Sequence, residues 1–87
     1  MTSRSRASGA LDQVRVLDLT TEYAGALVGA ALADHGAQVL HLERAGSLET
    51  FAHRGKRRVR WAGQGRDGGL LEALVARADV ILEDAPA

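Results

Sequence analysis

The sequence has no cysteine, and this absence excludes a disulfide framework, a thiolate zinc site and a thiol nucleophile. Aromatic residues are scarce, with one Trp, one Tyr and one Phe in 87 residues. Eleven Lys and Arg residues balance eleven Asp and Glu residues, so the chain lacks the positive field that binders of nucleic acids or anionic membranes use. We therefore expect no nucleic-acid partner and no membrane partner. The expected location is cytoplasmic.

Long hydrophobic runs are also missing. The longest uncharged stretch, from Tyr23 to Ala33, has about half the length that a bilayer requires. Arg4 and Arg6 stand among serines with no apolar core after them, which argues against a secretory signal. We predict a disordered tail over residues 1–10 and one domain over residues 11–87, because 46% apolar and 25% charged residues are typical of a folded chain.

The first half of this domain has the pattern of a βαβ unit, with buried strands predicted over Val14–Leu19 and Ala37–Leu42. Between them, Thr20 or Thr21 should cap a helix that starts at Tyr23, and Gly36 should supply the left-handed residue that ends it. The two strands should run parallel. The apolar residues at helical spacing, which we expect to face the sheet, are Ala24, Leu27, Val28, Ala31 and Leu32.

The second half repeats this order after a loop. Residues 45–55 lack periodicity and allow at most one helical turn around Leu48–Ala52. A short strand over Arg57–Trp61, a helix over Leu70–Arg77 and a strand over Val80–Leu82 follow. The predicted fold class is α/β, a Rossmann-like open sheet of about four mainly parallel strands with two or three helices.

Charged residues near the strand ends allow several kinds of site. A run from Arg54 to Arg60 packs five positive charges into seven positions, which would attract a phosphate-rich ligand or simply form a solvated strand face. Glu43 imitates the acidic residue of dinucleotide-binding folds, but the turn before the first helix lacks the glycine-rich pattern, so NAD is not favoured. Glu43 could instead pair with Arg44. No metal is expected, because the three histidines fit no ligand spacing.

Six blocks of the sequence occur in an order and spacing that resemble the N-terminal segment of the family III CoA-transferases. This family, also called CaiB/BaiF, includes formyl-CoA and carnitine CoA-transferases and α-methylacyl-CoA racemases. The resemblance covers nearly all of the chain. The blocks are Leu11–Thr20, Ala24–Gly25, Leu32–Leu40, Leu42–Arg44, His53–Arg57 and Leu74–Glu83.

The resemblance implies acyl-CoA metabolism, in which a carboxylate nucleophile attacks a thioester to transfer CoA. The aspartate that performs this attack in the family has no counterpart here, so we expect no catalytic residue in this chain and no transferase activity by the chain alone. The expected ligand is CoA or acyl-CoA, bound by an N-terminal portion of a larger protein. The alternative is a noncatalytic interaction module that pairs with another chain or with a C-terminal part of the same protein.

The resemblance also implies positions for the CoA site. Arg44 matches the CoA-binding arginine of the family and follows a strand, where open α/β sheets bind ligands. Its guanidinium suits a phosphate. Glu22 and Tyr23 border the site, and the block that resembles Asn-Arg-Gly-Lys-Arg places Lys56 and Arg57 near the cofactor or as a pin for the loop. Asp84 stands where the family has asparagine, which puts negative charge at a CoA contact.

Overall fold

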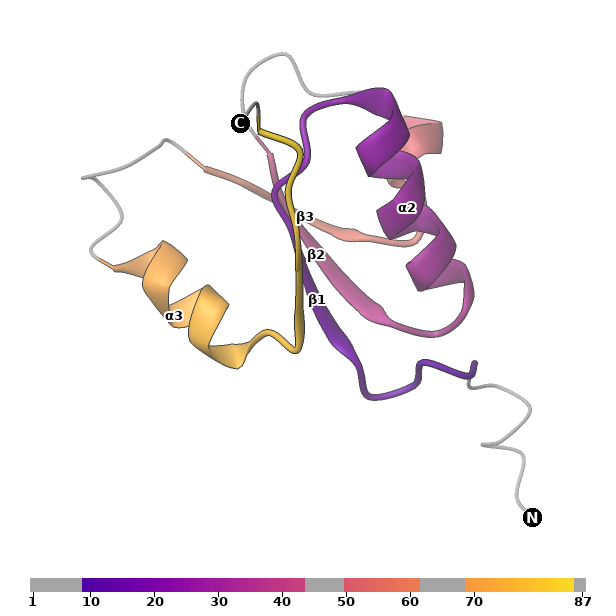
Figure 1. Cartoon of the computed structure of the whole chain (residues 1–87), viewed down its shortest axis with the longest axis horizontal. Helices are drawn as coiled ribbons and strands as arrows, with labels where there is room; N and C mark the ends of the chain where they lie inside the picture. The colour runs from indigo at the N-terminus through magenta and orange to yellow at the C-terminus, as the bar shows by residue number, and fades with distance from the viewer. Residues whose placement is uncertain (1–8, 44–49, 62–68, 86–87) are drawn as a thin grey trace.

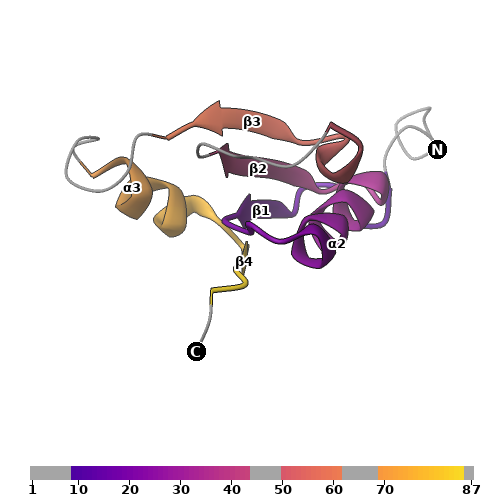
Figure 2. The same ribbon diagram turned by 90° about the horizontal axis from the view of Figure 1, so that it is seen from above.

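The computed structural model describes residues 9–43, 50–61 and 69–85, and its elements follow the predicted order (Figure 1). The elements are β1 (Arg15–Asp18), α2 (Tyr23–Asp34), β2 (Gln38–Glu43), η1 (Thr50–His53), β3 (Arg57–Arg60), α3 (Leu70–Arg77) and β4 (Val80–Leu82). The predicted tail lies almost entirely outside the described residues. The described strands form one sheet in the order β3-β2-β1-β4 with every neighbouring pair parallel, as Figure 2 shows for the adjacent arrows. The α/β, Rossmann-like prediction is confirmed.

The sheet separates two small cores, because α2 and α3 lie on its opposite faces (Figure 1). Val16 of β1 is paired in register with Val39 of β2, and these two side chains pack with Ala37 on the α2 side. The next residue of β1, Leu17, points to the other face and packs with Leu42 and Trp61 on the α3 side. Successive side chains of a strand alternate between faces, so one short strand contributes to both cores. Trp61, which directly follows β3, is thus buried in the α3-side core.

The buried face of α2 differs from the predicted one. Ala26, Gly29 and Ala30 are buried, whereas Val28 of the predicted face is 51% exposed. The helix is apolar on every side, so hydrophobic spacing could not select a face. The helix lies close to the sheet, so its buried face is made of its smallest residues, Ala26, Gly29 and Ala30, instead.

The start of α2 also differs from the prediction. Glu22 is the N-cap residue and its side chain makes no capping bond, while the Thr20 hydroxyl donates to Asp18 instead. The predicted threonine cap is therefore wrong, because the acidic side chain two residues before Thr20 competes for its hydroxyl. The predicted end is confirmed, since Gly36 has a φ of +102°.

The helix α3 has the predicted bounds and packs through Leu70, Leu71 and Leu74 against the core around Leu17. No α3 residue is fully buried, and Val75 on α3 and Ile81 on β4 are exposed. The helix lies mainly over β1. Among the described residues, none of the helices has the length and apolar character needed to cross a bilayer.

Candidate functional site

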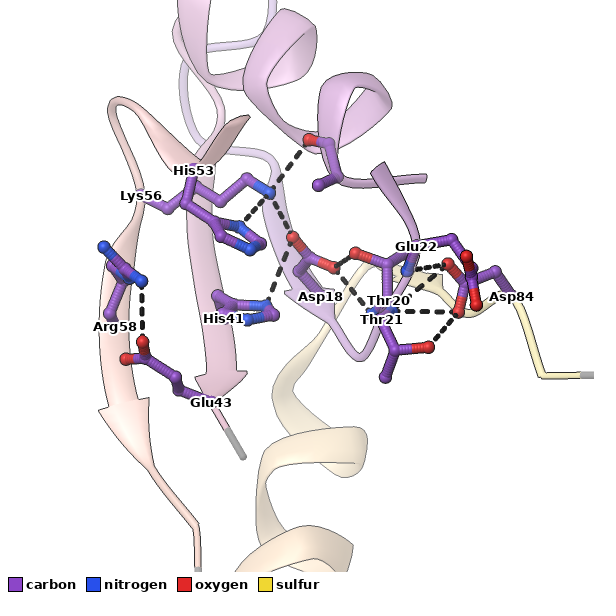
Figure 3. Close-up of polar contacts among 11 residues, drawn as sticks. Asp18, Thr20, Thr21, Glu22, His41, Glu43, His53, Lys56, Arg58 and Asp84 are labelled. Carbon is purple, nitrogen blue, oxygen red and sulfur yellow. Dashed lines mark hydrogen bonds and ion pairs between the residues drawn. The ribbon is translucent and has the colours of Figure 1, made fainter. Parts of the chain in front are cut away.

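Polar residues meet where β1 and β4 end, in two adjacent networks (Figure 3). We call the first the Asp18 cluster; it comprises Asp18, Thr20, His41, His53 and Lys56. The second is the Asp84 cap, in which Asp84 contacts Thr21 and Glu22. Thr20 and Thr21 are consecutive in the turn between β1 and α2, so this turn belongs to both networks.

A lysine is at the centre of the Asp18 cluster. Lys56 Nζ donates to Asp18 Oδ2 at 2.5 Å, to His53 Nδ1 at 2.8 Å and to the Ala26 carbonyl at 2.9 Å. An ammonium group has three protons, so all of its donors are used. The side chains of Lys56 and Asp18 are both 0% exposed. The pair therefore joins the loop before β3, the strand β1 and the helix α2 from within.

The Asp18 carboxylate is surrounded by donors. Its Oδ1 accepts from the Thr20 backbone N–H at 2.9 Å and from the Thr20 hydroxyl at 2.6 Å, while His41 Nδ1 lies 3.5 Å from Oδ2. Burial alone would raise the pKa of Asp18, but the contacts from His41, Lys56 and Thr20 outweigh it and hold that pKa well below its usual range. Asp18 is therefore an ionised structural group that no substrate can reach.

The two histidines of the cluster lie face to face. The rings of His41 and His53 are stacked, with centroids 3.9 Å apart and an angle of 25° between their planes. Burial, followed by the nearby His41 and Lys56, lowers the pKa of His53 to about 4. His53 is therefore neutral near pH 7, which leaves its Nδ1 free to accept the bond from Lys56.

The cluster also contains groups that bind metals in other proteins. Asp18, His41 and His53 each offer one ligand atom, and these atoms lie within 4.8 Å of one another. Lys56 Nζ, however, is already bonded to Asp18 and His53. The ammonium thus supplies to these groups the positive charge that a metal ion would otherwise bring.

The Asp84 cap joins the end of β4 to the turn before α2. Asp84 Oδ1 accepts from the Thr21 N–H at 3.0 Å, and Oδ2 accepts from the Glu22 N–H at 2.8 Å. These bonds lower the pKa of Asp84, and the bond from the Thr21 N–H has the largest effect. Gly25 permits the approach, because a Cβ there would lie 2.7 Å from Asp84 Oδ2.

The residues predicted to contact CoA fall into three places. Glu22, Tyr23 and Asp84 come together at the β1–α2 turn, where Tyr23 is 48% exposed. Lys56 is buried in the Asp18 cluster. Arg57 pairs in register with Leu40 on the α3 side of the sheet. Arg44 lies outside the described residues.

The run of positive charge from Arg54 to Arg60 does not form one patch. Arg54 pairs with Asp34 at 2.9 Å, and Arg58 pairs with Glu43 at 2.6 Å across β3 and β2 (Figure 3). Lys56 is used inside the cluster. Three of the five charges, those of Arg54, Lys56 and Arg58, therefore serve separate contacts with acidic residues of α2, β1 and β2.

Sequence reasoning missed the Asp18 cluster. A signal did exist for His41, because it pairs in register with Asp18 and so lies on the same face of the sheet. No periodicity could place His53, which follows a segment without regular pattern. Nor could spacing show that the side chain of Lys56, three residues after His53, would point into the interior rather than toward solvent.

The family model for CoA-transferase family III matches residues 11–86. Over 72 residues, 80% of this chain, the sequence is 42% identical to alpha-methylacyl-CoA racemase of Mus musculus. The chain thus belongs to CoA-transferase family III, as the sequence blocks indicated. It spans 19% of the length of this curated relative.

Proposed function

We propose that this chain is the CoA-binding portion of a family III CoA-transferase-like protein that acts in acyl-CoA metabolism. The observation that carries the proposal is the meeting of Glu22, Tyr23 and Asp84 beyond the carboxyl ends of β1 and β4. Open parallel sheets bind their ligands at this edge, where the strand order reverses. Membership of the family supplies the ligand class.

The charges at this edge suggest how CoA would lie. Asp84 is an ionised acceptor, so it suits a donor such as the adenine amino group or a ribose hydroxyl and would repel a phosphate. Arg44 directly follows β2, and we propose it as the phosphate ligand. Tyr23 offers an accessible ring at the turn. Lys56 would act indirectly, by holding the β1–α2 turn in place through Asp18.

The transfer chemistry needs a carboxylate that can attack a thioester. Asp18 is wholly buried, and Asp84 is engaged with two backbone N–H groups. Neither of these two aspartates is free to act as the nucleophile. We therefore propose that this chain alone binds CoA without transferring it, and that a partner chain or further sequence supplies the catalytic group.

Calorimetric titration of the 87-residue chain with CoA tests the proposal. We expect Arg44→Ala to weaken CoA binding at least about tenfold, because a charge-assisted hydrogen bond contributes roughly 1.5–3 kcal/mol. Arg54→Ala is the matched control, since its partner Asp34 lies at the other end of α2. Absence of heat at millimolar CoA would overturn the binding role. Transfer of CoA between two acids by the purified chain would overturn the noncatalytic role.

A second candidate function is assembly. Val80 and Ile81 on the edge strand β4 and Val75 on α3 are exposed apolar residues, and exposed strand edges are surfaces for pairing. Sedimentation would then show self-association or dependence on a partner chain. A monomer at all accessible concentrations, with no partner retained, contradicts this function while leaving CoA binding intact.

A further inference from the structure

A pocket of about 680 Å³ lies on the α3 side of the sheet, away from the Asp18 cluster and the Asp84 cap. Leu17 of β1 and Leu40 of β2 form part of its apolar floor, and Leu74 and Ala78 form part of its wall beside α3. The Asp18 side chain points to the other face, because it alternates with Leu17 along β1. The pocket is therefore separate from the edge assigned to CoA.

Among the described residues that line this pocket, three are arginines and none is acidic. Arg15 is within 3.8 Å of Asp79, which lies beside the pocket rather than among its lining residues. Arg57 and Arg77 are exposed, and neither has an acidic partner within residues 9–43, 50–61 and 69–85. An apolar floor beside two uncompensated guanidinium groups is complementary to an apolar surface that carries carboxylates.

The sheet geometry indicates which kind of acidic partner fits. Parallel sheets are normally covered by helices on both faces. On this side α3 lies mainly over β1, while Arg57 and Val59 of β3 remain exposed. A sheet face offers side chains, since its backbone N–H and C=O groups are directed at neighbouring strands. A helix, which presents a ridge of side chains, is thus better suited than an added strand.

We propose that this pocket is the docking groove for an acidic amphipathic helix from a partner. Apolar side chains of the helix pack on the partly exposed Leu40 and Leu74, above the buried Leu17. Its carboxylates pair with Arg57 and Arg77, whose planar guanidinium groups can bind a carboxylate through two parallel hydrogen bonds. Apolar residues at helical spacing supply the affinity, and the flanking acids supply the selectivity.

A charge-exchange experiment on the whole 87-residue chain tests this groove. The probe is a labelled helical peptide of about 18 residues with leucines at positions i, i+3, i+4 and i+7 flanked by glutamates. Its matched control has lysines in place of the glutamates, and binding is followed by fluorescence anisotropy. We expect the glutamate peptide to bind the unmodified chain at least about tenfold more tightly than the lysine peptide.

The double variant Arg57→Glu/Arg77→Glu should reverse this preference. Arg60→Glu is the control, because Arg60 lies on the same strand but on its opposite face, in backbone register with Glu43. It should keep the preference for the glutamate peptide. Melting followed by circular dichroism verifies that each variant folds. Equal binding of the two peptides, no binding of either, or a preference that the double variant leaves unchanged would overturn the proposal.

Two further outcomes identify other occupants. Concentration-dependent dimers that exclude the glutamate peptide would show that a second copy of the chain fills the groove, and would overturn the acidic-helix assignment. Because Arg57 is also among the residues predicted to lie near CoA, the single variant Arg77→Glu separates the two sites. If Arg77→Glu loses CoA binding, this groove belongs to the CoA site and the acidic-helix assignment is overturned. Unchanged CoA affinity together with a weaker preference for the glutamate peptide supports the groove as a site of its own.

Discussion

At the scale of single residues, the buried pair of Lys56 and Asp18 has the greatest influence. Both charges are removed from water, so each is tolerable only while the other is present. The remaining lone pairs and protons are also satisfied, by Thr20, His53 and the Ala26 carbonyl. Stability should therefore depend on the pair as a unit rather than on either member.

We predict that Lys56→Met lowers the free energy of unfolding by about 3–5 kcal/mol, because it leaves a buried carboxylate without its cation. Urea denaturation measures the change. Arg60→Met, at an exposed position of the same segment, should change stability by less than about 0.5 kcal/mol. The double variant Asp18→Asn/Lys56→Met should be more stable than Lys56→Met alone. Equal stability of Lys56→Met and the unmodified chain would contradict the structural role.

The neutral His53 makes stability depend on pH. Its pKa is about 4 in the folded chain and 6.5 as the ordinary value, so the unfolded chain takes up a proton first as the pH falls. Stability is complete above about pH 6.5 and decreases toward pH 4, with a loss of about 2 kcal/mol between pH 7 and pH 5. Urea denaturation at these two pH values measures the loss. His53→Asn keeps a hydrogen-bond acceptor but cannot titrate, so it should remove the contribution of His53 to the dependence of the free energy of unfolding on pH. An unchanged pH dependence in this variant would contradict the assignment of that contribution to His53.

At the scale of elements, α2 sits on the sheet through its smallest side chains. A Cβ at Gly29 would lie 2.9 Å from both Asp18 Oδ2 and Lys56 Cε. The backbone of the helix thus forms part of the wall of the Asp18 cluster. The position of α2 and the position of the ion pair are consequently coupled.

Gly29→Ala tests this coupling. Alanine favours a helix by about 1 kcal/mol over glycine, whereas overpacking costs roughly 1–3 kcal/mol. We expect the cost of overpacking to exceed the gain in helix propensity, because the atoms displaced belong to a buried ion pair. Thermal melting should therefore show a lower Tm. Val28→Ala on the exposed side of the same helix should leave Tm almost unchanged. A raised Tm for Gly29→Ala would show that the Asp18 cluster accommodates the added methyl group without a loss of stability, and would contradict the coupling.

The elements were more predictable than their contacts. Strands such as Val80–Leu82 and the helix Leu70–Arg77 were predictable because β-branched runs and helical spacing are local signals. The buried side of α2 was not, since all of its sides are apolar. The place of Glu22 and Tyr23 in the turn between β1 and α2 was predictable from the βαβ pattern, whereas their assignment to the CoA site stays a prediction from the resemblance. The stacked histidines could not, because His53 is placed by a contact with α2 and β2 that no local pattern encodes.

At the scale of the whole molecule, Asp84 connects the last strand to the first turn. Its contacts with Thr21 and Glu22 span more than sixty positions of the sequence, with separations of 63 and 62 residues. The carboxylate therefore closes the two βαβ halves against each other at the edge assigned to CoA. Loss of this contact should loosen the turn before it unfolds the sheet.

We predict that Asp84→Ala accelerates hydrogen exchange at the amides of Thr21 and Glu22 while the amides of β1 keep their protection. Two-dimensional NMR of the exchanging chain measures both groups. Glu83→Ala is the control, because Glu83 accepts only a local bond from the Ala85 N–H among the described contacts. Uniformly faster exchange throughout the sheet would mean that Asp84 supports the entire fold instead.

The stacked imidazoles offer an internal spectroscopic reporter. Two aromatic rings with centroids 3.9 Å apart shift each other's carbon-bound proton resonances upfield through their ring currents. The chain has only three histidines, so the exposed His35 provides the unshifted reference. A one-dimensional proton spectrum of unlabelled material can therefore indicate, sample by sample, whether the interior of a variant is assembled.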